Sequence, residues 1–451
     1  MTHGVKWSQF IIDTLREDCA VVIAMNTANM ALAGFERNFY LKLRSTKPCL
    51  IQDFCVKNEC PDVYEQLLEQ EFLIPAEIDE GEVYLSSLSK QINEHDTLAI
   101  HFLPTLGCNF RCPYCYQDGI SRAGNMKKGD VDSIRHLLEQ YLTQNPQIHK
   151  FALTLHGGEP TCNWDIVPYA LATFKQIADA FALEFSTGIV SNGYLLTPEK
   201  SDLLAQYSWN RFQVTIDGLP DVHNKRRRLP NGQDTFSQII ENIKYIFDKD
   251  LLPVVDVRIN FDQSNVDNIP SLIDYLSDIF AADKISLSFG YISQTVDGNE
   301  SHEYIKDAQI NYDDFSDKYT QLFRYAFSKG FPLKDCFLFG GLCMSKLRNS
   351  FAISPDGAIY KCLSMVGRES AQMANWRTIS TLDGIPSMLD YEILKACLDE
   401  KCPFVPICNG DCRFDSLVCK GNIKIRNCRK DILFKLNSMI LQEKYASFVE
   451  L

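Results

Sequence analysis

Three cysteines lie within eight residues of one another, in the run Cys108-Asn-Phe-Arg-Cys-Pro-Tyr-Cys115. Thiolates at this density bind soft metals, and in a chain that is not secreted this interpretation outweighs disulfides. An all-cysteine structural zinc site needs four ligands, usually as two C-x2-C pairs, and no fourth cysteine lies nearby. Three thiolates on a [4Fe–4S] cluster would leave one iron free to bind a small molecule. The spacing therefore predicts a catalytic cluster on Cys108, Cys112 and Cys115.

The surrounding pattern predicts how these cysteines are positioned. Thr97-Leu-Ala-Ile-His-Phe-Leu103 is strand-like, so the cysteines lie on the loop that leaves a strand. The alternation of strand and helix then continues to about residue 330. Strands are predicted near 98–105, 151–156, 185–191, 211–217, 254–261 and 284–291. Helices are predicted near 130–143, 166–182, 198–207, 235–248, 266–280 and 312–328. Six such units predict an α/β fold with a partial parallel (β/α)6 barrel, which carries its chemistry on such loops.

Two of the predicted strands are followed by small polar runs. Gly157 and Gly158, followed by Glu159 and Pro160, would let the backbone approach a ligand closely. Ser191-Asn192-Gly193 offers a hydroxyl and an amide for a ribose or a carboxylate. An ordinary turn is the alternative interpretation for both runs.

The fourth and fifth strands end in charged or polar residues. Asp217 precedes a glycine, so an Asp-Gly turn is the alternative to a ligand contact. Alternation along the run 255–260 places Arg258 and Asn260 on one face, opposite the valines and the isoleucine, and so in the barrel lumen. A buried arginine needs an anionic partner, and we favour a bound carboxylate over a structural ion pair.

Composition narrows the class of protein. With 45% hydrophobic and 23% charged residues, the 451-residue chain resembles ordinary globular proteins of two or three domains. The net charge of −13 argues against a nucleic-acid surface, and the basic run Lys225–Arg228 is interpreted as a solvated turn. Without an apolar stretch of bilayer length or a signal-peptide pattern, no membrane association is expected and a cytoplasmic location is predicted. Thiols stay reduced in the cytoplasm, so disulfides do not explain the seventeen cysteines. Metal clusters would explain them.

Residues 1–96 are predicted to form a separate N-terminal module. Ala20–Ala24 and Asn38–Leu43 are expected to be short strands, and Pro61–Glu71 to be a helix. Strands that flank one or two helices suit a small winged-helix-like module. Six cysteines without paired spacing are interpreted as small core residues: Cys19, Cys49, Cys55, Cys60, Cys162 and Cys419.

The strand–helix alternation of residues 97–332 stops before a cysteine-rich stretch at 333–430. Nine cysteines fall between residues 336 and 428, around a predicted hairpin at Ile353–Cys362 with a Pro-Asp-Gly turn. Loop-rich sequence with so many thiolates predicts a domain nucleated by metal. The thiolates alone do not distinguish zinc from iron as the bound metal. Residues 431–451 are predicted to be a C-terminal helix.

The first cysteine run resembles the defining motif of the radical SAM superfamily, C-x3-C-x-aromatic-C, with Tyr114 in the aromatic position. The run Gly157–Pro160, about forty residues later, resembles the methionine-binding motif of that family. The resemblance implies a six-strand barrel and a [4Fe–4S] cluster whose open iron binds S-adenosylmethionine, which one electron cleaves to a 5′-deoxyadenosyl radical. It also implies that the residues at the strand ends contact this cofactor: Tyr114, Gly157, Gly158, Glu159, Pro160, Ser191, Asn192, Asp217, Arg258 and Asn260.

The later cysteines resemble the SPASM extension of that family, which carries two auxiliary clusters. The matching pattern is C-x13-G-x4-C, then C-x5-C-x3-C, then one more cysteine. By this resemblance the nearer auxiliary cluster would use Cys336, Cys343, Cys362 and Cys412. The farther cluster would use Cys402, Cys408 and Cys428. Where the family has a further cysteine this chain has Asp399, which we predict as the fourth ligand; Cys397 and an open site are the alternatives. Three [4Fe–4S] clusters are therefore expected.

The resemblance implies an oxidoreductase that modifies peptides. SPASM enzymes mature ribosomally made precursors, and in such enzymes an N-terminal module often captures the leader of the precursor as an added strand. Sulfatase maturases place an aspartate base directly after the cysteine that ends G-x4-C, where this chain has Leu363. We therefore predict an oxidative cross-link (carbon–carbon, carbon–oxygen or thioether) in a precursor peptide, with a flavodoxin or ferredoxin as electron donor. Formylglycine formation and oxidation of a small molecule are the alternative reactions. A protein that is not an enzyme, such as a cluster scaffold or an electron carrier, is the alternative from a different functional class.

Overall fold

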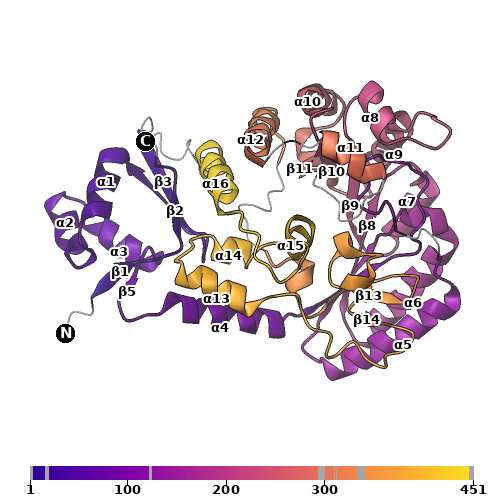
Figure 1. Ribbon diagram of the computed structural model, residues 1–451, viewed down its shortest axis with the longest axis horizontal. Helices are drawn as coiled ribbons and strands as arrows, with labels where there is room; N and C mark the ends of the chain where they lie inside the picture. The colour runs from indigo at the N-terminus through magenta and orange to yellow at the C-terminus, as the bar shows by residue number, and fades with distance from the viewer. Residues whose placement is uncertain are drawn as a thin grey trace.

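The computed structural model describes residues 4–15, 20–120, 124–292, 300–308, 310, 312–332 and 341–445 (Figure 1). Its largest sheet has nine strands in the order β11-β10-β9-β8-β7-β6-β12-β13-β14. Six neighbouring strands are parallel and follow chain order: β6 (Thr97–Phe102), β7 (Lys150–Leu155), β8 (Glu184–Ser191), β9 (Trp209–Thr215), β10 (Val255–Phe261) and β11 (Ile285–Tyr291). They confirm the predicted mostly parallel sheet.

Helices cover the outer face of this sheet, as Figure 1 shows on the right of the molecule. They include α5 (Lys128–Gln144), α6 (Val167–Ala180), α7 (Pro198–Ala205), α9 (Phe236–Asp248), α10 (Ile269–Ile279) and α12 (Tyr312–Ser328), whereas α8 (Pro220–Arg226) and α11 (Glu300–Ala308) contact residues at the strand ends. In β6, Leu98, Ile100 and Phe102 are fully buried, while the residues between them are partly exposed. This alternation gives each strand one face against the helices and one toward the barrel interior.

The predicted hairpin exists and joins the barrel sheet, which sequence analysis did not anticipate. Strands β12 (Ser350–Ile353) and β13 (Ala358–Tyr360) are antiparallel, and β14 (Ala374–Asn375) follows them. Strand β12 lies parallel to β6, with Ile353 beside Phe102. Apolar residues on both sides of this junction, Leu103 and Leu106 after β6 and Met365 and Val366 after β13, form one buried cluster. The cysteine-rich stretch is therefore anchored next to the loop that carries the first three cysteines.

The N-terminal residues form two small antiparallel sheets and several helices. Strand β1 (Val5–Trp7) pairs with β5 (Leu73–Pro75), and β2 (Ile11–Asp13), β3 (Val21–Asn26) and β4 (Leu32–Glu36) form a three-stranded sheet. The helices are α1 (Arg37–Ser45), α2 (Ile51–Lys57), α3 (Pro61–Glu69) and α4 (Glu80–Asn93).

One expected strand in this region is wrong, because Asn38–Leu43 lies inside helix α1. The carboxylate of Glu36 accepts hydrogen bonds from the backbone N–H of Asn38 (2.9 Å) and Phe39 (2.8 Å), which caps the helix. Tyr40 and Leu43, three residues apart, then share its buried face.

The C-terminal elements bridge the two halves of the molecule. Helices α13 (Tyr391–Asp399), α14 (Val405–Cys408) and α15 (Arg413–Lys420) are short, and the last helix is α16 (Lys430–Tyr445). In Figure 1, α16 lies between the barrel helix α12 and the N-terminal strands, and it contacts α12, β2 and β3. None of the described helices combines the length and apolar character needed to cross a bilayer.

Candidate active site

A cavity of about 450 Å³ lies where the parallel strands end. Ten of the residues singled out from the sequence line it: Cys108, Cys112, Tyr114, Cys115, Gly157, Gly158, Ser191, Asn192, Arg258 and Asn260. Glu159, Pro160 and Asp217 are not among its lining residues. The cavity also reaches Tyr116 and Gln117 on the cysteine loop, and Leu363 and Ser364 beyond the hairpin. Residues more than 250 positions apart in the sequence thus share one wall.

The two glycines after β7 hold the cysteine loop. A Cβ atom at Gly158 would lie 2.3 Å from the carbonyl oxygen of Gly107, and one at Gly157 would lie 2.3 Å from that of Thr105. Gly157 also has a φ of +146°, which disfavours any side chain. The backbone N–H of Glu159 donates to the carbonyl oxygen of Gly107 at 2.8 Å. The close approach that these glycines permit is therefore to the residues just before Cys108, while both glycines still face the cavity.

Glu159 acts behind the cavity wall. Its carboxylate, in a residue only 1% exposed, accepts hydrogen bonds from the hydroxyl of Ser191 (2.9 Å) and the backbone N–H of Asn192 (2.7 Å). The side-chain amide of Asn192 donates in turn to the side-chain oxygen of Asn109 at 2.8 Å. Glu159 thereby fixes the end of β8, and Asn192 connects that strand end to the cysteine loop.

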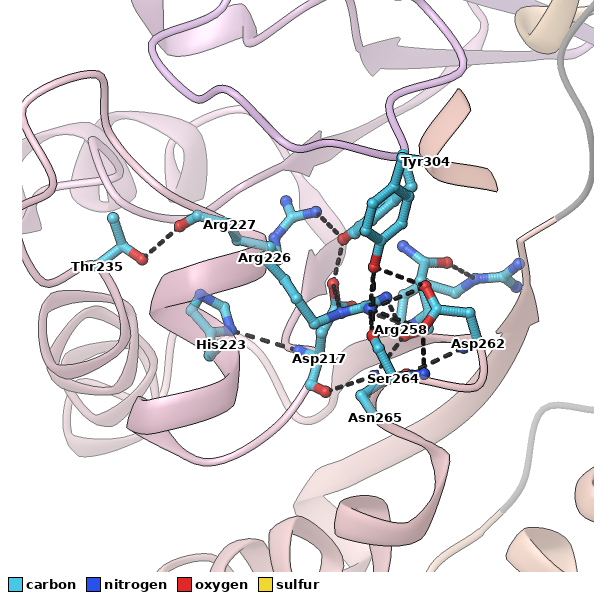
Figure 2. Close-up of polar contacts among 12 residues, drawn as sticks. Asp217, His223, Arg226, Arg227, Thr235, Arg258, Asp262, Ser264, Asn265 and Tyr304 are labelled. Atoms are coloured by element: carbon cyan, nitrogen blue, oxygen red, sulfur yellow. Dashed lines mark hydrogen bonds and ion pairs between the residues drawn. The ribbon is translucent and has the colours of Figure 1, made fainter. Parts of the chain in front are cut away.

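Asp217 is also buried behind the wall, in the network drawn in Figure 2. Its carboxylate accepts a hydrogen bond from the phenol of Tyr114 and one from the backbone N–H of Asn260 at 3.0 Å. The side-chain amide of Asn265 donates to its backbone carbonyl oxygen at 2.8 Å. Asp217 therefore orients the aromatic residue of the cysteine run and the end of β10.

The basic run at residues 225–228 is not a solvated turn, because Arg226 and Arg227 are only 5% and 9% exposed. Arg226 pairs with Asp262, its Nη1 lying 2.8 Å from Oδ2, and its Nε lies 3.6 Å from a carboxylate oxygen of Asp217. Its guanidinium lies over the ring of Tyr114, 4.9 Å from the centroid. Helix α8 presents this arginine inward, and the carboxylates that neutralise it come from other strand ends.

Arg227 lines the cavity itself. Its Nη1 donates to the phenol oxygen of Tyr114 at 3.0 Å, and its guanidinium lies 5.7 Å from the ring centroid of Phe110. Sequence analysis missed both arginines. The basic run is visible in the sequence, but the run alone does not reveal which of its side chains point into the protein.

Arg258 and Asn260 lie on the wall formed by β10. The Nε of Arg258 donates to the side-chain oxygen of Asn260 at 3.2 Å. Gly290, opposite Asn260 on β11, was also missed: a Cβ there would lie 2.3–2.4 Å from both side chains. A glycine inside a strand was the signal that could have revealed this close approach.

His156 is the histidine of the cavity wall. Burial lowers the pKa of its imidazole to about 4, so the ring is neutral near pH 7. The backbone N–H of Gly157 donates to its Nδ1 at 2.7 Å, which places the ring proton on Nε2. His156 is therefore a hydrogen-bond donor at Nε2, and no described carboxylate side chain lines the cavity beside it.

A second group of thiols lies in the C-terminal region. Cys397, Cys402, Cys408 and Cys428 line one small pocket, where Nη1 of Arg426 lies 3.5 Å from the Sγ of Cys397. Asp399 lines a different cavity, with Lys6 and Glu77. This placement favours Cys397 over the predicted Asp399 as the fourth member of the farther set.

Cys343, Cys362 and Cys412 form a third group. Burial, together with the neighbouring thiols of Cys412 and Cys343, raises the pKa of Cys362 to about 12. The predicted fourth member, Cys336, lies outside the described residues. The buried ammonium of Lys346 donates to the carbonyl oxygens of Cys408 (2.8 Å) and Asn409 (2.9 Å), and so connects this group to the farther one.

The remaining cysteines fit the core interpretation only in part. Cys55 is buried and Cys60 is half-buried beside it, but Cys49, Cys162 and Cys419 are exposed. Cys19 lies outside the described residues. The core interpretation is therefore wrong for the three exposed cysteines.

The donor set fits clusters better than single ions. Within the described chain, no three histidine, cysteine, aspartate or glutamate side chains converge closely enough to hold one metal ion. Cysteines on an iron–sulfur cluster bind different iron atoms, so they do not need to converge on one point. The thiols that line the cavity and the small C-terminal pocket match this requirement.

Comparison with known proteins defines the class. Residues 102–276 match the Radical SAM superfamily. These residues are therefore identified as a radical SAM domain, and enzymes of this superfamily bind a [4Fe–4S] cluster and S-adenosylmethionine.

The relatives include enzymes that act on peptides and proteins. The radical SAM cyclopropyl synthase TigE of Paramaledivibacter caminithermalis is 25% identical over 298 residues, which are 60% of this chain and 57% of TigE. The chain thus spans little more than half the length of TigE. A cysteine-type anaerobic sulfatase-maturating enzyme of Clostridium perfringens is 22% identical over 76% of this chain and 93% of the relative. The crystal structure of Streptococcus suis SuiB bound to the precursor peptide SuiA shares the fold, with a TM-score of 0.51 and 15% identity over 94% of this chain and 99% of SuiB.

Proposed function

We propose that this chain is a SPASM-type maturase that forms an oxidative side-chain cross-link in a ribosomally made precursor peptide. The observation that carries the proposal is the reach of the cavity. It extends from the cysteine loop to Leu363 and Ser364, which directly follow Cys362. A side chain held there would lie between the first three cysteines and the third thiol group. Cross-linking removes two electrons and two hydrogens from the peptide, so a nearby electron acceptor is required.

The wall residues suit the superfamily's cofactor. Cys108, Cys112 and Cys115 would hold the cluster, and S-adenosylmethionine would lie against Gly157, Gly158, Ser191, Asn192, Arg258 and Asn260. When bound, these groups supply radical hydrogen abstraction. Arg258 offers a guanidinium for a carboxylate, and the hydroxyl and amide at the end of β8 offer partners for a ribose. Glu159 and Asp217 position these groups from behind.

The C-terminal thiols would hold two auxiliary clusters. Cys336, Cys343, Cys362 and Cys412 are proposed for the nearer one, and Cys397, Cys402, Cys408 and Cys428 for the farther one, in place of the set with Asp399. Residues 333–430 would then be one metal-nucleated domain, between the barrel of residues 97–332 and the helical segment 431–451. A cytoplasmic location and an electron donor such as a flavodoxin or ferredoxin belong to the same proposal.

The N-terminal residues 1–96 would bind the leader of the precursor in a winged-helix-like module. Among the described strands, β4 pairs only with β3, so its other edge is open. An extended peptide can add to such an edge through backbone hydrogen bonds.

Formylglycine formation is the second candidate, supported by the near-complete coverage of the Clostridium perfringens relative. The cavity favours cross-linking over it. Leu363 stands where the family's aspartate base is expected, and the described lining contains no carboxylate to replace that base. Oxidation of a small molecule is a further alternative.

The test uses Cys362→Ala in the reconstituted full chain, with candidate precursor peptides from neighbouring reading frames as substrates; the peptide that the unaltered chain converts is the one used for the comparison. The variant should still release 5′-deoxyadenosine, yet the peptide should not lose two hydrogens by mass spectrometry. Cys419→Ala, which removes an exposed thiol outside both pockets, is the matched control. A folded Cys362→Ala protein that makes the two-hydrogen product at the normal rate would refute the proposed electron acceptor.

A further inference from the structure

Two arginines of the basic run, Arg226 and Arg227, are buried, and neither is among the cofactor contacts proposed above. Arg226 is shared by two carboxylates, those of Asp217 and Asp262. Arg227 faces the cavity, and the hydrogen bond of its guanidinium goes to the neutral phenol of Tyr114. Figure 2 shows the side chains of Arg226 and Arg227 pointing to different partners, with the guanidinium of Arg226 among the contacts of Asp262.

The negative charges near Arg227 are already engaged. The carboxylate of Asp217 accepts hydrogen bonds from Tyr114 and from the backbone N–H of Asn260, and Arg226 lies beside it. Among the described residues, the Nε of Arg227 is buried and has no acceptor. A buried guanidinium with an unused N–H is unfavourable unless an anion lies nearby.

Besides the phenol of Tyr114, the cavity wall that includes Arg227 carries thiols of the first cysteine run, among them that of Cys112. Burial raises the pKa of Cys112 to about 11, and the largest opposing influence is the charge of Arg227. Arg227 is thus placed on the wall beside Cys112, and its position is set by Tyr114 in the same cysteine run.

We propose that Arg227 is the fixed cation that sets the reduction potential of the first cluster, through its charge and a hydrogen bond from Nε to a cluster sulfur or to the Cys112 thiolate. The proposal rests on the assignment of Cys108, Cys112 and Cys115 to that cluster. Net charge, hydrogen bonds to the sulfurs and solvent exposure are what set such potentials. One-electron reduction makes the cluster more negative, so a buried cation stabilises the reduced form and raises the potential.

Arginine suits this role because it stays charged at every accessible pH. The hydrogen bond to Tyr114 and the contact with Phe110 restrict its guanidinium to one position. Arg228, the next residue, is exposed, so solvent screens its charge.

The experiment is an anaerobic redox titration of the reconstituted full chain, followed by electron paramagnetic resonance. The first cluster is the one whose signal changes when S-adenosylmethionine is added. Arg227→Gln should make its reduction at least tenfold less favourable, a fall in potential of ~59 mV for a one-electron couple. Arg227→Lys should shift the equilibrium by less than threefold. Arg228→Gln is the matched control and should leave it unchanged.

Each outcome decides the inference. A signal of unchanged potential in Arg227→Gln overturns it, as does an Arg227→Lys protein that behaves like Arg227→Gln. If Arg227→Gln takes up no iron at this site, the lysine variant decides: iron uptake restored by lysine supports the charge, and failure of both variants shows a packing role. Absence of a signal that responds to S-adenosylmethionine in the unaltered chain would instead refute the assignment of the cluster.

Discussion

The barrel mouth and the C-terminal region, which carry the thiols proposed as cluster ligands, differ in what holds their backbone. At the barrel mouth, the loop of Cys108–Cys115 follows a buried strand and is fixed by the two glycines after β7 and by Asn192. In the C-terminal region the thiols lie on short elements such as α14, four residues long, and Cys343 and Cys428 are exposed. The difference suggests that the barrel positions its thiolates, whereas the C-terminal region needs its thiolates to hold its own fold.

The largest effect is expected from removing the first three thiols. The triple variant Cys108→Ala, Cys112→Ala, Cys115→Ala should lose all cleavage of S-adenosylmethionine and about four of roughly twelve irons. Its barrel should stay folded, because buried strands and helices hold it. Iron analysis and circular dichroism test this. A triple variant that keeps its full iron content, or that unfolds, would contradict the claim that the barrel folds independently and positions these thiolates for a cluster.

Iron removal should separate the two regions. In protein treated with a chelator, a protease should cut first within residues 341–430 and at least about tenfold faster than in the loaded protein, because local stability there depends on the bound metal. The barrel strands should stay protected. Mass spectrometry of the fragments gives the order of cleavage. If both regions are equally protected after iron removal, the C-terminal region does not depend on metal for its fold.

Gly158→Ala tests whether the barrel positions the cysteine loop. The new Cβ would lie 2.3 Å from the carbonyl oxygen of Gly107 and 2.4 Å from that of Leu106, so the loop must move. A displacement near 1 Å costs about a hundredfold in rate, so cleavage of S-adenosylmethionine should fall by that order. Gly129→Ala is the matched control, since nothing lies within 4 Å of its new Cβ. Normal cleavage in the Gly158→Ala protein would show that the loop tolerates the shift.

Single ligands of the farther thiol group should have smaller effects. Cys397→Ala should lose iron or shift the potential of the farther cluster, because ligand identity sets the potential. Asp399→Ala should leave both unchanged, since its carboxylate lies in another cavity. Iron content and redox titration distinguish the two variants. If Asp399→Ala loses iron and Cys397→Ala does not, the fourth ligand is Asp399, as predicted from the sequence.

A further effect, confined to acid pH, is on the stability of the barrel. Burial lowers the pKa of His101 to about 3 and that of His156 to about 4, both below the ordinary 6.5. Between pH 6.5 and 4 the unfolded chain binds these protons and the folded barrel does not, so the free energy of unfolding decreases as the pH is lowered, by about 1.4 kcal/mol per pH unit for each histidine. Replacing His156 with asparagine should flatten this slope in denaturant titrations, whereas His136→Asn, on the exposed face of α5, should not. The sequence after residue 302 contains no histidine, so histidine protonation makes no contribution to the acid stability of the C-terminal region.

Local patterns in the sequence determined the barrel, the first cysteine run and the faces of β10. Strand periodicity and helix periodicity are local properties, and they placed the six parallel strands to within a few residues. Alternation along β10 placed Arg258 and Asn260 on the cavity wall, because side chains of a strand alternate between its two faces. The spacing of the three cysteines needed no tertiary information either, since they belong to one loop.

Only the tertiary structure decided which polar groups face the cavity and which lie behind it. Glu159 and Asp217 turn away from it to join strand ends that are distant in sequence, and Arg227 turns in while Arg228 stays exposed. The choice between Cys397 and Asp399 has the same character. Two residues apart on α13, they lie on nearly opposite faces of the helix, since each residue turns by about 100°. Which face meets the other thiols depends on how α13 packs, and no local pattern contains that information.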